Sequence, residues 1–208
     1  PAPGIANLVI TAQNRIPVIA PVEIIPADGA YIIANEFSVV DNNNNLADYN
    51  ESVSISISLE NVGVEGATNL TAILTTDDPY ITLITDSTAI ESIGSEEIVV
   101  LPAVFELEIA DNVPDQYRAD FTIEIVADEG TWNSNKSLTI NAPDFTVGEI
   151  SLEEIEGNNN GYMNGGETIL ITASFQNTGH SESPEALATF VCNNPYITVQ
   201  ENSLLLMT

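Results

Sequence analysis

Two loops rich in Asn, Asp and Glu are the part of this sequence best suited to chemistry. Residues 156–167 read EGNNNGYMNGGE. They follow the calcium-loop pattern D-x-[DN]-x-[DN]-G-x5-E at positions three, five, six and twelve, with Glu in place of Asp at position one. Calcium takes about six to eight oxygen ligands. The predicted ligands are the side chains of Glu156, Asn158, Asn160, Asn164 and Glu167 and the carbonyl of Tyr162.

The first loop is a weaker match to the same pattern. Val40 falls at position one, so Asp41 would have to serve there. Strand-like segments flank both loops, so calcium would stiffen a β scaffold and would have no catalytic role. A plain turn is the alternative, because Asn and Asp tolerate left-handed backbone and bond to their own main chain. The predicted ligands of the first loop are Asp41, Asn42, Asn44, Asp48 and Glu51.

The residues of known catalytic sites are scarce. The chain has one histidine, His180, and one cysteine, Cys192. A Cys–His nucleophile needs the two side chains within hydrogen-bond reach, whereas a free cysteine usually behaves as a small buried hydrophobe. We expect a solvated loop position for His180 and a structural role for Cys192, and we predict no zinc site. The paired acids 96–97 and 106/108 are expected on solvent faces of strands. The sequence therefore predicts a non-enzyme.

The charge balance excludes several partners. Three basic residues stand against 31 acidic ones, giving a net charge of -28. Phosphate binding needs Lys and Arg, so nucleic acid and anionic membrane surfaces are excluded as partners. Divalent cations, cationic partners or simple solubility fit the charge. No apolar run is long enough to cross a bilayer, so no membrane insertion is predicted.

Alternating apolar and polar residues predict strands throughout. The clearest segments are 53–59 (VSISISL), 105–109 (FELEI), 121–126 (FTIEIV), 137–141 and 168–175. Their period of two is that of half-buried strands, and no helical period extends over a useful length. Turn residues punctuate the chain at short intervals. We therefore predict an all-β fold of immunoglobulin-like sandwiches.

The sequence also repeats itself. A shift of 116 residues maps 42–44 onto 158–160, Glu51 onto Glu167, 61–63 onto 177–179 and 79–82 onto 195–198. Such a repeat predicts tandem modules. The predicted domains are a complete sandwich at 27–143 and a partial second one at 144–208, which lacks counterparts of 105–109, 121–126 and 137–141. Residues 1–26 would be the end of a preceding domain or extra strands that complete the second module.

These motifs resemble a known family. Residues 8–25 (LVITAQNRIPVIAPVEII) resemble the closing strands of the immunoglobulin-like domain that follows the catalytic domain in gingipain-type cysteine peptidases. The remainder resembles tail modules of secreted peptidases and surface proteins of the Bacteroidetes. Their pattern is an Asn/Asp/Gly loop ending in Gly-Glu, an Asn-x-Gly strand end and a Pro-Tyr-Ile-Thr turn. The turn at 111–116 (DNVPDQ) also looks like a family feature, whereas Asn50 departs from the Gly-Glu ending.

The resemblance implies a secreted or cell-surface protein whose export signal would lie beyond Thr208, with a peptidase as the parent catalytic domain. The family's catalytic His and Cys have no counterpart here. We therefore expect non-catalytic spacer or bracing modules with calcium as the cofactor. The alternative is an adhesin-like module for extracellular protein or carbohydrate. Trp132, Tyr80 and Tyr196 could then line a sugar-binding face, although packing is favoured for all three.

Overall fold

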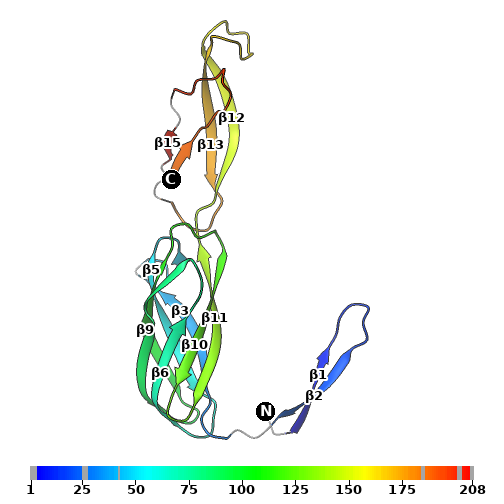
Figure 1. The fold of residues 1–208 in the computed structure, drawn as a ribbon, viewed down its shortest axis with the longest axis vertical. Coiled ribbons are helices and arrows are strands. Elements are labelled where there is room, and N and C mark those ends of the chain that lie inside the picture. The colour runs from blue at the N-terminus through cyan, green and yellow to red at the C-terminus, as the bar shows by residue number, and fades with distance from the viewer. Residues whose placement is uncertain (1–3, 25–27, 42, 184–185, 201–202, 207–208) are drawn as a thin grey trace.

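The computed structural model describes residues 4–24, 28–41, 43–183, 186–200 and 203–206 (Figure 1). All regular secondary structure in these ranges is β-strand, which confirms the predicted all-β sandwich fold. The described residues include no helix able to span a membrane.

Two sheets pack face to face in the first sandwich. One has the order β3 (Ile32–Val40), β5 (Ser52–Asn61), β9 (Ile98–Ile109), β7 (Ile81–Thr85). The other has the order β4 (Ala47–Asp48), β11 (Thr131–Asn141), β10 (Tyr117–Val126), β6 (Ala67–Thr75), β8 (Ser87–Ile93). Neighbouring strands are antiparallel, except that β4 runs parallel to β11.

The core follows the sequence alternation. Apolar positions of β5 and β10 point inward, including Ile55, Ile57, Phe121 and Ile123, and Phe105 of β9 is fully buried with them. Each such side chain contributes about 1.5–3 kcal/mol by leaving water. Most outward positions are polar, although Ile98 and Val100 of β9 are exposed, so the sandwich has an apolar interior and mainly polar outer faces.

Four more strands continue the long axis beyond the sandwich (Figure 1). β12 (Phe145–Glu156) pairs with β13 (Thr168–Asn177), and β14 (Ala186–Thr189) pairs with β15 (Ser203–Leu206). The shift of 116 carries the bounds of β5 onto β13, and the β6–β8 register onto β14–β15. Among the described residues of 145–206, no strand corresponds to β9, β10 or β11, and apolar side chains of β12 such as Val147 and Leu152 are exposed.

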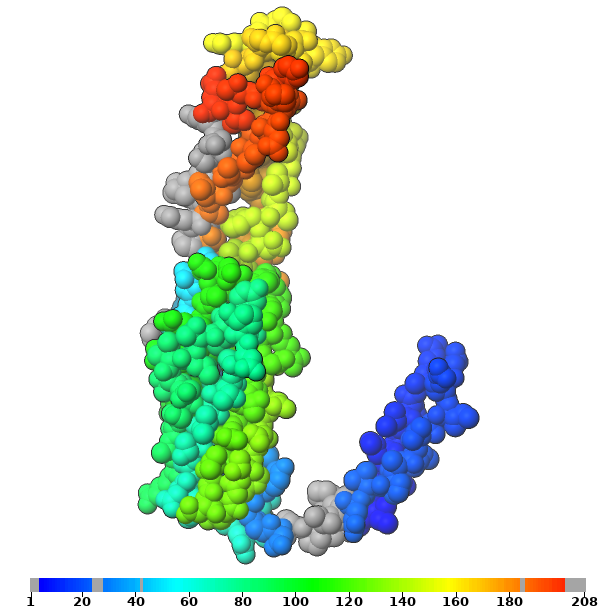
Figure 2. Space-filling view, viewed as in Figure 1, coloured from blue at the N-terminus to red at the C-terminus, as the bar shows by residue number. Residues whose placement is uncertain are grey.

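A hairpin of β1 (Gly4–Ile10) and β2 (Val18–Ile24) precedes the sandwich. Its strands pair only with each other, and Figures 1 and 2 show it apart from the sandwich and from β12–β15. Every residue of β1 is exposed, and Ile16 in the turn is 90% exposed. The domain boundaries remain predictions, and the boundary at 26–27 lies outside the described residues.

Candidate functional site

The first acidic loop gathers three carboxylates between β3 and β5. Oδ1 of Asp41 accepts hydrogen bonds from the backbone N–H groups of Asn43 and Asn45, both at 2.8 Å. The backbone N–H of Asp48 donates to Oε2 of Glu51 at 3.3 Å. The other oxygens, Oδ2 of Asp41 and Oδ1 of Asp48, are shielded from solvent and have no hydrogen-bond partner among the described residues. Buried acceptors without a donor are costly, so this loop has unused capacity for a cation.

The electrostatics of the first loop also favour a bound cation. Burial raises the pKa of Glu51, and the negative charges of Asp41 and Asp48 raise it further, against a lowering by the Asp48 amide. A group held near like charges resists ionisation. A divalent cation would reverse this balance, because it becomes the largest local charge.

The asparagines of the first loop shape its turns. Oδ1 of Asn44 accepts from the backbone N–H of Leu46 and its Nδ2 donates to Asp48, each at 2.8 Å. Its oxygen is therefore already used, as the plain-turn alternative requires. Asn50 has a φ of 54°, which explains why Asn can replace the glycine of the family pattern at this position. Asn42 lies outside the described residues.

In the second loop, Glu154 lies where the sequence pattern places Glu156 as the first ligand. Oε1 of Glu154 accepts from the backbone N–H of Asn159 at 2.7 Å, and its Oε2 is shielded from solvent without a partner among the described residues. Glu156 is instead an exposed residue at the end of β12. A Cβ at Gly157 would lie 2.1 Å from Oε1 of Glu154 and 2.6 Å from Cγ of Glu167. The glycine thus lets these two acids approach each other.

The remaining predicted ligands of the second loop bond to each other and to the main chain. Oδ1 of Asn158 accepts from the N–H of Asn160 at 3.0 Å, and Oδ1 of Asn160 accepts from the N–H of Tyr162 at 2.8 Å. Asn164 donates through its backbone N–H to Oε2 of Glu167 at 2.7 Å and through Nδ2 to the Tyr162 carbonyl at 3.2 Å. This loop holds two carboxylates where the first holds three.

Neither loop is a finished metal centre. Among the described residues, no group of three or more Asp, Glu, His or Cys side chains is already arranged to hold a metal ion. A cation would have to draw the carboxylates closer together. The first loop offers more anionic oxygens and so fits calcium better than the second, although the second matches the sequence pattern more closely.

A second cluster joins the sandwich to the strands beyond it. Asp115 lies in the turn between β9 and β10, and its Oδ1 accepts from the backbone N–H groups of Ala142 and His180 at 3.0 and 3.1 Å. Its Oδ2 lies 2.7 Å from Nδ1 of His180. Asp115 thus connects the first sandwich, the linker after β11 and the loop after β13. We call Asp115, Ala142 and His180 the junction clamp.

The environment of Asp115 favours its charged form. Burial raises its pKa, but the hydrogen bonds from the Ala142 amide, the His180 ring and the His180 amide outweigh burial and lower the pKa to about 2. The Asp115 side chain is 15% exposed and that of His180 is 58% exposed. His180 is thus an exposed loop residue, as expected, but the sequence did not predict the bond between its ring and Asp115.

The Asn-x-Gly motifs fasten the first strand of each repeat. Oδ1 of Asn61 accepts from the N–H groups of Tyr31 and Gly63 at 3.1 and 2.9 Å, while its Nδ2 donates to the carbonyls of Glu65 and Gly94 at 2.7 and 3.1 Å. Asn61 is fully buried. Asn-x-Gly is therefore a structural motif and not a ligand site.

Asn177 repeats this bonding in the second copy. Its Oδ1 accepts from Asp144 and Gly179 at 3.0 and 3.1 Å, and its Nδ2 donates to the Ser181 carbonyl at 2.9 Å. Gly179 passes so close to the linker that a Cβ would lie 2.2 Å from the Ala142 carbonyl oxygen. The second motif thus reinforces the junction clamp.

The other singled-out side chains show no shared site. Cys192 is a half-buried free thiol, and the acids at 96, 97, 106 and 108 are exposed. Trp132 packs partly buried against the core, and Tyr80 meets Tyr117 edge-on with ring centroids 4.9 Å apart. Tyr196 is 94% exposed.

Comparisons with known proteins give a structural similarity but no family. No protein-family model and no curated protein matches the sequence. Among solved structures, native alpha-2-macroglobulin from Escherichia coli, spanning domain MG7 to the C-terminus, is similar with a TM-score of 0.39 and 13% identity. The similarity covers 59% of this chain and 20% of that chain.

Proposed function

We propose that this chain is a non-catalytic spacer of a secreted or cell-surface protein, holding a gingipain-like peptidase domain at a fixed distance and orientation. The junction clamp is the observation that carries this proposal. Units joined by a short linker and a small interface usually move relative to each other. A spacer that sets orientation must suppress that motion.

The clamp is suited to this task because one charged side chain holds three groups at the joint, and two of them belong to His180 on its far side. Hydrogen bonds to a charged group contribute about 1.5–3 kcal/mol each. Two of the three involve backbone N–H groups, which leave no side-chain rotation to lose. The Asn177 and Gly179 contacts add a second fixed point beside the first.

We infer that calcium at the first acidic loop braces the same end of the sandwich. The loop contacts the strand that leads into the junction: β4 pairs with Ile140 and Asn141, and the N–H of Tyr49 donates to the Asn141 carbonyl at 2.9 Å. A cation held by Asp41, Asp48 and Glu51 would therefore fix the end of β11 at Asn141, which directly precedes Ala142 of the clamp. The unpartnered carboxylate oxygens support this assignment.

Secretion and the peptidase partner rest on the sequence resemblance alone. The excess of acidic over basic residues agrees with an extracellular role, in which solubility matters and nucleic acids are not partners. An adhesin-like role is the second candidate, and a polar depression on the outer face of β6, β10 and β11 favours it.

Stiffness can be measured by pulsed electron spin resonance between two spin labels. In a Cys192→Ser background, cysteines would replace the exposed residues Thr85 and Ser151, one on each side of the junction. We expect a narrow distance distribution that Asp115→Ala broadens, while Asp111→Ala, in the same turn but outside the clamp, leaves it unchanged. A broad distribution in the parent chain would refute the spacer proposal.

A further inference from the structure

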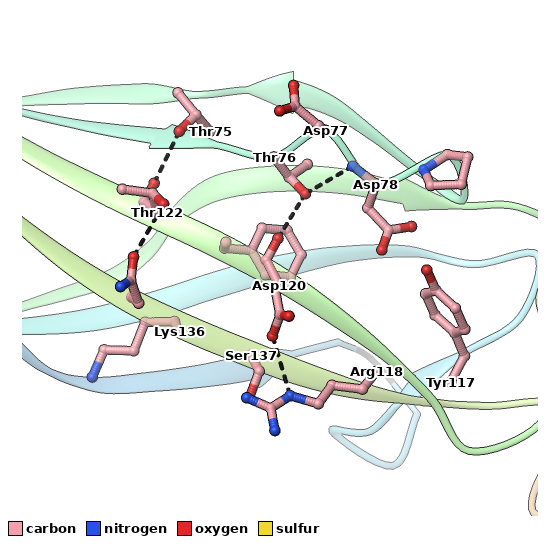
Figure 3. A pocket seen from close by; sticks show the side chains of 13 residues that line it. Thr75, Thr76, Asp77, Asp78, Tyr117, Arg118, Asp120, Thr122, Lys136 and Ser137 are labelled. Carbon is pink, nitrogen blue, oxygen red and sulfur yellow. Dashed lines mark hydrogen bonds and ion pairs between the residues drawn. The ribbon is translucent and has the colours of Figure 1, made fainter.

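A shallow depression of about 740 Å³ lies on the outer face of β6, β10 and β11 (Figure 3). Its lining residues include no carboxylate of the acidic loops and no residue of the junction clamp. Thr75, Thr122 and Asn135 line it, together with Arg118 and Asp120.

The outer face of β11 is unusual for so acidic a chain. Its outward positions are Thr131, Asn133, Asn135, Ser137, Thr139 and Asn141, which are all short, polar and uncharged. A face that serves only solubility normally carries interspersed Lys, Arg, Glu and Asp. On β11 this row carries hydroxyl and amide groups alone, whereas the charged side chains of the same face, Arg118, Asp120 and Glu124, lie beside it on β10.

Two hydrogen bonds connect Asn135 of this row to Thr122 of β10, and Thr122 to Thr75 of β6. The strand register sets Thr122 opposite both Thr75 and Asn135. Oγ1 of Thr75 donates to the Thr122 carbonyl at 3.3 Å, and Oγ1 of Thr122 donates to Oδ1 of Asn135 at 3.2 Å. Thr75, Thr122 and Asn135 are therefore pre-ordered, which reduces the entropy lost when a ligand binds.

The depression also presents strong donors and acceptors side by side. Nε of Arg118 donates to Oδ1 of Asp120 at 3.1 Å, and both side chains are largely exposed. This contact uses one of the five guanidinium N–H groups and one of the two carboxylate oxygens. Lys136, the second cation at the depression, donates to the Asn35 carbonyl at 2.7 Å and so lies at its rim.

We infer that this face binds a neutral oligosaccharide. Each sugar hydroxyl is both a donor and an acceptor, and the face offers both kinds of group at fixed spacing. Arg118 and Asp120 would bind neighbouring hydroxyls, and Thr122 and Asn135 would bind the next sugar along. A polyanion is disfavoured, because the depression holds Asp77, Asp78 and Asp120 and the whole chain carries a charge of -28.

The test is binding of the full chain to a printed panel of neutral, uronic-acid-containing and sulfated oligosaccharides, followed by titration calorimetry with the strongest ligand. We expect a neutral oligosaccharide to bind with little dependence on salt. Arg118→Ala and Thr122→Val should each weaken binding at least about tenfold, which corresponds to about 1.4 kcal/mol.

Arg15→Ala is the matched control, because Arg15 is the chain's third cation and lies in the β1–β2 hairpin. It should bind like the parent chain, and all variants should keep the parent melting temperature. The inference is wrong if no neutral oligosaccharide binds, if only acidic ones bind, or if Arg118→Ala and Thr122→Val both bind like the parent chain. The face would then be a plain solvated surface.

Discussion

Asn61 should be one of the most sensitive polar positions of the first sandwich. Replacing it by Ala removes four hydrogen bonds of 2.7–3.1 Å that join the start of β3, the turn after β5 and the turn after β8. A typical net contribution is about 1 kcal/mol per bond. Since some freed groups lie near the surface and can bond to water, we expect a loss of about 3–4 kcal/mol. That is a large part of the stability of an ordinary domain.

The assay is urea unfolding followed by the fluorescence of Trp132. It is the only tryptophan and lies in β11, so the signal reports on the first sandwich. Asn61→Ala should lower the urea midpoint strongly without changing the slope of the transition. By the size scaling of unfolding entropy, the melting temperature should fall by about 10–15 °C.

Asn177→Ala is the control, because it removes the equivalent bonds outside the sandwich that contains Trp132. It should change the fluorescence-detected stability by less than about 1 kcal/mol. A loss of less than about 1 kcal/mol in Asn61→Ala would refute the argument. It would mean that water replaces the Asn61 amide at no net cost.

Two further predictions concern the acidic loops and the clamp. Millimolar calcium should raise the melting temperature over that in EDTA, because a ligand bound only by the folded state stabilises it. Glu51→Ala should abolish this rise and Glu167→Ala should reduce it little; the reverse order, measured by differential scanning calorimetry, would show that the second loop is the site. Asp115 has a lowered pKa of about 2, so its contribution to stability is present above its ordinary pKa of 3.8 and is lost as the pH falls towards 2. The label-to-label distance distribution of the parent chain should therefore broaden between about pH 4 and pH 2. If Asp115→Asn gave the same distributions as the parent chain across this range, the clamp would be contradicted.

Much of the fold follows from local pattern. Alternation in segments such as 53–59 and 121–126 fixes which side chains face inward, because a strand has a period of two. β5 and β10 follow this pattern. The repeat of 116 residues likewise corresponds to equal strand bounds in β5 and β13, since the same alternation and the same Asn-x-Gly ending occur in both.

The acidic loops show where pattern matching stops being informative. An ungapped register places Glu156 at the first ligand position. In the structure, Tyr31 and Asp144 donate the same backbone bond to Asn61 and Asn177, so these two residues are equivalent. Counted from them, Glu154 corresponds to Asp41. β12 is also longer than β3. Asparagine oxygens counted as ligands are also used by their own turns. The sequence gives the residue types present but not which lone pairs remain free.

The sequence by itself determined the all-β character, because alternation is a local property. Its acidic composition also limits the partners that long-range electrostatics allows. Only the tertiary structure decided that Asp115 meets His180, which is 65 residues away, and that the uncharged row of β11 lies beside Arg118 and Asp120. Such contacts depend on strand order and register, which arise from the packing of whole sheets, and residues distant in the chain carry no local signal of their proximity.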